Sequence, residues 1–323
     1  MSGHILFAYS LDGKGNGTIL NDVDIGQQHM ENHPIWVHLD ANHPDTKAWL
    51  ENVYNLDSSV IDALLADETR PRVSQFSDGI LLILRGVNLN SDADPEDMVS
   101  LRLWVDEFFV ITIWRRKLKA IGDIEEKLKA GFGPKNTGEF VCMLSSCLVE
   151  RMEPVLTDLD DSTDELEEKI LENARRSLRK DVIDVRKKAI IYKRYMVPQR
   201  DAFNQLSMVS VKWLHGKHKR QLFEIYNHVM RYVEDLDAIR DHAQIAKDEL
   251  SNSLADRLNK NMYVLSIISA IFLPLSFLTG LLGVNLGGIP GANDHRAFWI
   301  FSGILVVIVI LQIIMFIRLK WFK

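Results

Sequence analysis

Cysteine is scarce in this chain: only Cys142 and Cys147 occur among its 323 residues. A structural zinc site usually needs four ligands, and the spacing of this pair matches no zinc motif. A reducing cytosol makes a disulfide between them unfavourable. The pair is therefore expected to be buried, apolar thiols, with metal binding as the open alternative.

Charged residues are missing from two long stretches near the C-terminus. None occurs in Asn261–Asn293 or in Ala297–Ile317, although 25% of the chain is charged. About 20 apolar helical residues cross a bilayer core. Residues 262–283 and 297–317 are therefore predicted to be two transmembrane helices joined by an outer loop, 284–296. The N-terminus carries no targeting pattern.

The cations that flank these spans predict their orientation. Arg257 and Lys260 precede the first span, and Arg318, Lys320 and Lys323 follow the second in a basic tail, 318–323. The positive-inside rule then places both termini in the cytoplasm. The first 260 residues or so would form a large cytoplasmic body.

That body is predicted to begin with an α/β domain over residues 1–136. Short β-branched or aromatic runs bounded by turn residues predict strands, and two segments between them predict helices. The expected strands are Ile5–Tyr9, Ile35–Leu39, Gly79–Val87, Val99–Val105 and Phe108–Trp114, and the expected helices are Thr46–Val53 and Ser58–Ala66. The glycines of Asp12–Gly17 are not followed by Gly-Lys-Ser/Thr, so a hairpin loop is expected rather than a phosphate cradle.

Residues 137–260 are predicted to form a stalk of long helices, ahead of a transmembrane domain, 261–323. The first two helices are expected at Thr137–Asn173 and at Leu178–Trp213, the latter broken or bent at Pro198. Acidic residues crowd the first helix and basic residues the second. This favours a helical hairpin whose charges face each other and water, with a cation-attracting acidic surface as the alternative.

The third stalk helix has neither proline nor glycine between Gly216 and Pro274. It can run from about Lys217 to Gly283, on the order of 100 Å at 1.5 Å per residue. A stripe at 3-4 spacing consists of Leu222, Ile225, Val229, Tyr232, Leu236, Ile239, Ala243, Ala246 and Leu250. A stripe of this length predicts a seam against other helices, often copies of the same helix.

The first membrane span continues this spacing with polar and small residues. These are Asn259, Met262, Ser266, Ser269, Leu273, Ser276 and Gly280, and the opposite side holds Val264, Ile267, Ile268, Ile271, Leu275 and Leu278. Such a stripe is either a packing surface between helices or the wall of a pore. One helix cannot enclose a pore, so the second interpretation needs a homo-oligomer, which the stalk seam could hold together.

The architecture then shows a resemblance, carried by Gly283-Val284-Asn285 at the end of the first span and by the glycine-rich loop after it. With the stalk, the second span and the basic tail, it resembles the CorA superfamily of divalent metal ion transporters, the type with two transmembrane helices and a Gly-x-Asn signature. Gly-Val-Asn in place of Gly-Met-Asn is similar to its ZntB zinc-transporter branch.

The resemblance implies a homopentamer with an N-terminal α/β/α domain, a funnel of stalk helices and a ring of five Asn285 amides at the outer mouth. The pore positions it implies are Asn259, Met262, Leu265, Leu273 and Ser276, of which Met262 and Leu265 would form an apolar gate. It also matches Asp248 to a residue that senses intracellular metal.

The implied function is uptake of Zn²⁺ across the inner membrane, with proton coupling left open. Neither enzymatic chemistry, a cofactor nor nucleic acid is expected. The membrane spans contain no carboxylate, histidine or cysteine, so Asn285 would bind a hydrated ion. A proton-coupling group would lie outside the spans, with Asp294, His295 and Asp248 as candidates. The alternatives are Mg²⁺, Co²⁺ or Ni²⁺ transport, zinc efflux, and a membrane-anchored sensor that does not conduct.

One further motif lies at the start of the stalk. His215 and His218 form a His-x-x-His pair. It is either a polar helix connection or a zinc-sensing site. The expected partners are thus further copies of the chain, membrane lipid, divalent metal ions and protons.

Overall fold

The computed structural model describes residues 3–21, 33–283 and 294–318. They form two compact units, an N-terminal unit, Met1–Asp248, and a C-terminal unit, Glu249–Lys323. Each unit is described by itself. The division falls within the segment 137–260 that was predicted to be the stalk.

The N-terminal unit contains a seven-stranded sheet with the order β2-β1-β3-β7-β6-β5-β4. Its strands are β1 (Ile5–Leu11), β2 (Gly17–Ile19), β3 (Ile35–Asp40), β4 (Arg72–Gln75), β5 (Ile80–Gly86), β6 (Val99–Val105) and β7 (Phe109–Trp114). The β3–β7 pair is parallel and every other pair is antiparallel. All five predicted strands are confirmed, whereas the short strands β2 and β4 were missed.

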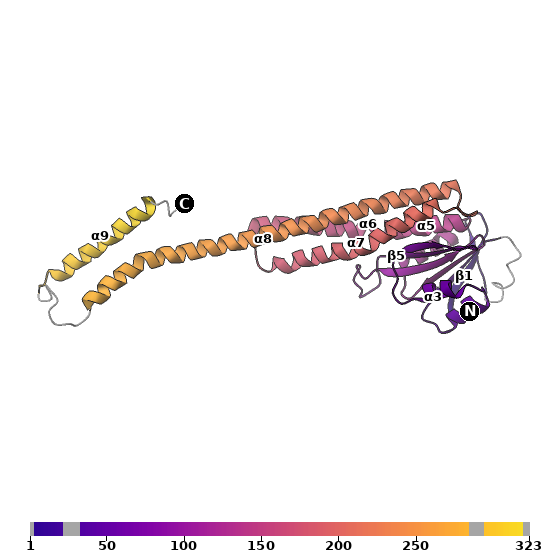
Figure 1. The fold of residues 1–323 in the computed structure, drawn as a ribbon, viewed down its shortest axis with the longest axis horizontal. Coiled ribbons are helices and arrows are strands. Elements are labelled where there is room, and N and C mark those ends of the chain that lie inside the picture. Colours follow the sequence, from indigo (N-terminus) through magenta and orange to yellow (C-terminus); the bar gives the residue numbers. More distant parts are fainter. Residues whose placement is uncertain (1–2, 22–32, 284–293, 319–323) are drawn as a thin grey trace. The chain divides into compact units, whose positions relative to one another are not determined.

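Helices cover both faces of this sheet, so the predicted α/β/α arrangement is confirmed (Figure 1). On one face α2 (Asp45–Asn52) and α3 (Ser58–Leu65) bury Leu50 and Ile61 in a core with strand residues such as Val37. On the other, the ring of Phe140 in α5 (Thr137–Glu150) lies 4.9 Å from the ring of Trp36. A further helix there, α4 (Lys119–Lys129), was not predicted.

The glycine-rich segment is the hairpin loop that was expected. β1 and β2 pair on either side of it. Asp12 Oδ1 accepts hydrogen bonds from the backbone N–H groups of Lys14, Gly15 and Asn16, at 2.7, 2.9 and 3.0 Å. With the Asn16 side-chain amide, which contributes most, they lower the Asp12 pKa to about 2. The carboxylate satisfies the turn itself and leaves no phosphate cradle.

The stalk helices differ from the prediction at their ends. The segment predicted as one helix, Thr137–Asn173, is two, because α5 ends at Glu150 and α6 (Glu153–Asn173) starts anew. Pro154 lies in the first turn of α6, where its missing N–H costs no helical hydrogen bond. Conversely, α7 (Leu178–Met208) continues through Pro198 and ends before the predicted Trp213. The predicted hairpin of α6 and α7 is confirmed by their contacts.

The apolar stripe of α8 (Gly216–Gly283) is a seam, but not between copies of the chain. In the N-terminal unit seven stripe residues are at most 8% exposed within a single chain: Leu222, Ile225, Val229, Leu236, Ile239, Ala243 and Ala246. Tyr232 is only half-buried and Val233 is buried beside it. Helices α5, α6 and α7 run alongside this part of α8 (Figure 1). The expectation that these residues join subunits is therefore wrong.

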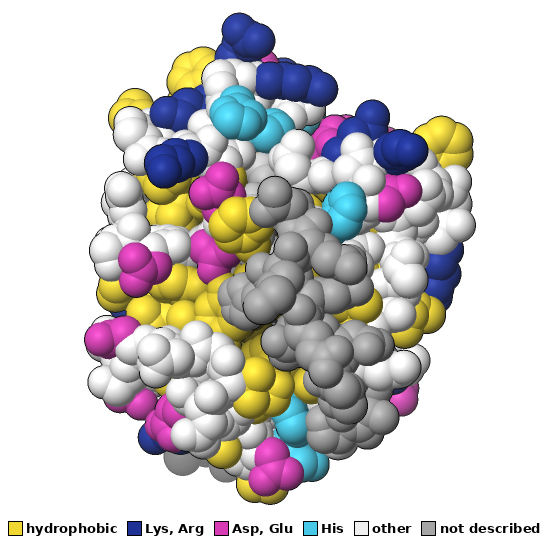
Figure 2. Space-filling view, turned by 90° about the vertical axis from the view of Figure 1, so that its right-hand side faces the viewer, with side chains coloured by type: hydrophobic (Ala, Val, Ile, Leu, Met, Phe, Trp, Pro, Cys, Tyr) yellow, Lys and Arg dark blue, Asp and Glu magenta, His cyan; other side chains and the backbone are white. Residues whose placement is uncertain are grey.

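Polar contacts join α8 to α7 and to α6, and no ion pair joins α6 to α7 among the described residues. Lys193 Nζ of α7 lies 2.5 Å from Asp237 Oδ1 of α8, and His242 Nδ1 of α8 lies 3.2 Å from Glu167 Oε1 of α6. Charges of both signs are also mixed with hydrophobic side chains over the described part of the face in Figure 2, where basic side chains gather at the upper edge. The basic segment of α7 and the acidic segment of α6 therefore both contact α8.

Both cysteines lie on α5, are free and are buried. Burial raises the Cys142 pKa to about 12. The prediction of buried apolar thiols is confirmed.

Candidate pore segment and metal-binding clusters

The C-terminal unit contains the end of α8 and the whole of α9 (Ala297–Arg318), both long and apolar enough to cross a membrane. α8 ends at Gly283, the predicted end of the first span, and α9 agrees with the predicted second span to within one residue. Asp294 precedes α9, and its Oδ1 accepts the backbone N–H of Arg296 at 2.8 Å while its carbonyl accepts that of Ala297 at 3.0 Å. Asp294 thus starts the helix.

The polar stripe of the first span lies on a different side of α8 from the one that contacts α9. Gln312 Nε2 of α9 lies 3.4 Å from the Ala270 carbonyl. The half-buried residues of the span gather on that side: Ile267, Ala270, Ile271, Leu275 and Leu278. The candidate pore residues are all exposed in the single chain: Asn259, Met262, Leu265, Ser266, Ser269, Leu273, Ser276 and Gly280. Within its own chain, α9 therefore leaves the candidate pore face open.

Two hydroxyl groups in this span donate within their own helix. Ser266 Oγ donates to the Met262 carbonyl at 2.9 Å, and Thr279 Oγ1 donates to the Leu275 carbonyl at 2.9 Å. The hydroxyl hydrogen is thereby used, and the lone pairs of the oxygen remain as acceptors. Ser266 consequently presents an acceptor on the stripe without needing a partner helix.

The signature tripeptide is described only at its first residue. Gly283 ends α8, and no described atom would come within 4 Å of a Cβ placed there. Val284 and Asn285 lie outside the described residues, as do residues 319–323 of the basic tail. The proposed amide ring stays a prediction.

The histidine pair in the N-terminal unit forms a close contact at the start of α8. Its ring centroids are 5.7 Å apart, and His218 Nδ1 accepts the backbone N–H of His215 at 3.3 Å. Burial, followed by the neighbouring His215, lowers the His218 pKa. One nitrogen of His218 is thus engaged in holding the turn, while its neutral ring has the protonation state that a metal ligand needs.

Asp248, matched to a metal-sensing position, is held within its own helix. Both carboxylate oxygens accept from Gln244 Nε2 at 2.9 Å. The carboxylate is exposed and retains lone pairs for a cation.

Two groups of potential metal ligands were missed by sequence reasoning. His4, His43 and Asp45 bring ligand atoms within 4.8 Å of one another, as do Asp164, Glu167 and His242. In the first group, Ile5 pairs with Leu39, which brings the start of β1 to the turn after β3. Two imidazoles and a carboxylate are a ligand set that zinc accepts. Each group combines two residues that are close in sequence with a third that is distant, so no sequence motif marks it.

Known proteins are similar to this chain over most of its length. A family model described as "CorA-like Mg2+ transporter protein" matches residues 31–318. A protein of Yersinia enterocolitica named zinc transport protein ZntB is 36% identical over 305 residues, 94% of this chain and 92% of that one. A protein of Pseudomonas aeruginosa named divalent cation transporter CmaX is 35% identical over 320 residues, 98% and 96% of the two chains.

The solved structures show the same fold. The structure of the full-length CmaX protein superposes with a TM-score of 0.86 at 34% identity, covering 99% of this chain and 100% of that one. Similarity therefore extends through the sheet, the long helices and the two apolar helices.

Proposed function

Because the chain belongs to the CorA-like Mg²⁺ transporter family, we propose that it carries divalent cations, with Zn²⁺ as its main substrate, into the cell across the inner membrane. Zinc is favoured because a relative 36% identical over 94% of the chain is named a zinc transport protein. In this proposal the N-terminal unit and both termini are cytoplasmic, and the chain performs no enzymatic chemistry.

The observation that supports a pore is the polar stripe of α8, which is exposed in the single chain and which α9 leaves uncovered. Five copies of this helix around one axis would turn Ser266, Ser269 and Ser276 toward a common centre. The stalk stripe is used within the chain, so the subunit contacts of a homopentamer would come from other surfaces, including the span itself.

The chemistry of that wall suits a hydrated ion. Water molecules bound to a cation turn their hydrogens outward, so a surface that solvates them must accept hydrogen bonds. Ser266 offers such lone pairs because its hydrogen is bound to the Met262 carbonyl, and an Asn285 ring would offer amide oxygens. Neutral acceptors hold a hydrated Zn²⁺ weakly enough for release.

Apolar residues next to the serines of the stripe would form a gate. Met262 and Leu265 are 66% and 64% exposed in the single chain. In a pentamer they would form apolar rings that close the pore by expelling water. Proton coupling would use Asp294, His295 or Asp248, because the two spans offer no carboxylate or imidazole and a proton carrier needs a titratable group.

Flux measurements on the purified full-length chain in liposomes test the proposal. Zn²⁺ entry is followed with an enclosed fluorescent indicator, with and without a pH gradient, and Mg²⁺ is tested in parallel. Asn285→Ala and Ser276→Leu should abolish selective Zn²⁺ flux. Ser302→Leu, a matched change on α9, should leave it intact.

Each other result has a defined meaning. Equal Mg²⁺ and Zn²⁺ flux would favour a general divalent channel, and flux only out of vesicles would indicate efflux. No flux of either ion would favour a non-conducting sensor. Proton-driven flux that survives replacement of Asp294, His295 and Asp248 would refute their coupling role.

A further inference from the structure

A cavity of about 640 Å³ lies in the N-terminal unit, between the sheet, the segments 67–70 and 96–98, and α7. Six arginines line it: Arg70, Arg85, Arg102, Arg115, Arg116 and Arg194. Four carboxylates also line it, so the wall carries an excess of two positive charges. The chain as a whole has a net charge of -6, and this local excess of the opposite sign requires a reason.

Arg102, on β6, is the most deeply placed of these arginines, with 1% of its surface exposed. Its Nη2 donates to the Ala66 carbonyl at 2.8 Å. Its Nε and Nη1 have no hydrogen-bond partner among the described residues. Burial lowers its pKa to about 10, with the nearby charges of Arg115 and Arg85 adding to the effect. A buried charge with unpaired donors is costly unless an acceptor compensates it.

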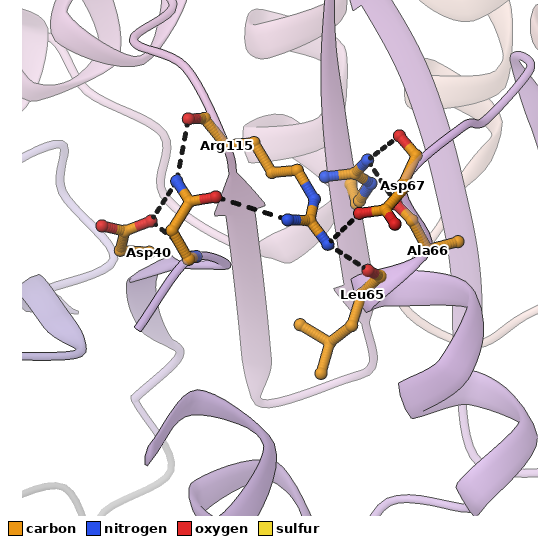
Figure 3. Close-up of polar contacts among 7 residues, drawn as sticks. Asp40, Leu65, Ala66, Asp67 and Arg115 are labelled. Atoms are coloured by element: carbon orange, nitrogen blue, oxygen red, sulfur yellow. Dashed lines mark hydrogen bonds and ion pairs between the residues drawn. The ribbon is translucent and has the colours of Figure 1, made fainter. Parts of the chain in front are cut away.

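The terminal nitrogens of the two flanking arginines donate hydrogen bonds to residues in the walls of the cavity. Arg115 Nη2 donates to the Leu65 carbonyl at 2.6 Å and lies 2.8 Å from Asp67 Oδ1 (Figure 3). Arg85 Nη1 donates to the Met98 carbonyl at 2.5 Å. The Nε groups of both arginines also lack a partner among the described residues. Three guanidinium groups therefore hold buried N–H donors that no residue described in the structure uses.

The carboxylates of the wall neutralise this group only in part: Glu68 attracts Arg85 and Asp67 attracts Arg102, but six arginines face four carboxylates. The Asp67 side chain, which pairs with Arg115, is 89% exposed, so water weakens its attraction. Arg85 stacks on the Tyr195 ring, 4.7 Å from its centroid, and donates to neutral carbonyls. The arginines thus keep their fixed positions while their positive charge stays available.

We propose that this cavity binds a small phosphate-bearing molecule, with the phosphate group held by Arg102 and flanked by Arg85 and Arg115. Guanidinium N–H groups make short, charge-assisted hydrogen bonds to phosphate oxygens, and a phosphate dianion matches the excess of two positive charges. The cavity exceeds the size of phosphate alone and lies in the range of small-molecule sites, roughly 300–1,000 Å³. This proposal is independent of the transported ion.

Thermal unfolding of the full-length chain in detergent tests it, with inorganic phosphate and adenosine monophosphate as the probes and KCl holding the ionic strength constant. For the wild type we expect a saturable rise in Tm with each probe. Arg102→Lys keeps the charge but loses the Nε and Nη1 donors, so the rise should disappear. Arg175→Lys, an exposed arginine outside the cavity, should retain it.

A second variant covers the case in which Arg102→Lys does not fold. Arg116→Glu reverses the charge of an exposed side chain on the cavity wall and should weaken phosphate binding severalfold, followed by ³¹P NMR line broadening. No saturable binding by the wild type overturns the proposal. So does binding unchanged in Arg116→Glu or in folded Arg102→Lys, which would leave Arg102 as a purely structural donor. If Tm rises with inorganic phosphate but not with adenosine monophosphate, the ligand is the free anion, and the proposal of a larger phosphate-bearing molecule is overturned.

Discussion

Leu236 provides the most direct test of the finding that the α8 stripe is part of the core of a single chain. The side chain is 0% exposed in the N-terminal unit. Replacing a fully buried leucine by alanine removes its transfer free energy and leaves a cavity, at a cost of about 2–5 kcal/mol. For a unit of this size, each kcal/mol lowers Tm by about 2–4 °C. Leu236→Ala should therefore lower Tm by about 4–20 °C.

Intrinsic fluorescence of the full-length chain in detergent measures this change. Five tryptophans, Trp36, Trp49, Trp104, Trp114 and Trp213, lie in the N-terminal unit and report on it. The control is Ile245→Ala, whose side chain on the same helix is 64% exposed and should change stability by less than about 0.5 kcal/mol.

The two interpretations of the stripe differ in how concentration matters. If Leu236 lies in the core of one chain, its substitution lowers Tm by the same amount at every protein concentration and leaves the oligomer intact. A subunit seam would make Tm rise with concentration and would release smaller species on size-exclusion chromatography. A concentration-dependent loss in Leu236→Ala, or a loss equal to that of Ile245→Ala, would refute the reasoning.

Three further predictions concern the N-terminal unit. Burial lowers the His38 pKa from 6.5 to about 3, so below pH 6.5 the unfolded chain binds a proton that the native chain excludes; the free energy of unfolding is fully retained above pH 6.5 and falls by about 2 kcal/mol by pH 5. His38→Phe should remove this slope in pH-dependent unfolding, whereas exposed His228→Gln should keep it. Gly15 has φ +114° and its Cβ would lie 2.7 Å from the Gly131 carbonyl, so Gly15→Ala should lower stability by about 1–3 kcal/mol. Gly122 in α4 has no described atom within 4 Å of such a Cβ, so Gly122→Ala should raise stability by about 0.5–1 kcal/mol, and a loss in thermal unfolding would contradict this.

The sequence predicts best where one physical effect dominates. Two uncharged runs of membrane-spanning length are enough to predict α9 and the end of α8. Runs of β-branched residues are enough to predict the central strands. Proline is less decisive: Pro154 begins a helix, whereas Pro198 and Pro274 lie inside helices that continue. The same residue type acts differently because only the first turn of a helix lacks the hydrogen bond that proline removes.

Contacts between distant segments could not be predicted in the same way. The α8 stripe identifies a buried face, but apolar residues pack equally well against the same chain or a copy. Arg85 and Arg102 belong to β5 and β6, and Arg115 directly follows β7. They meet only because those strands are neighbours. Their spacing in sequence carries no periodic signal, so the cavity appears only in three dimensions.

Ser266 separates the two interpretations of the membrane stripe, because its hydrogen bond lies within α8. Ser266→Ala removes that bond together with its only donor, so no buried group is left unpaired and stability should change by less than about 0.5 kcal/mol. If the stripe lines a pore, the substitution still removes an acceptor from each subunit, and Zn²⁺ flux in liposomes should fall while Tm and oligomer size stay constant. If the stripe only packs helices together, alanine is as small as serine and flux should be unchanged. A change in oligomer size without a change in flux per oligomer would likewise assign the stripe to packing.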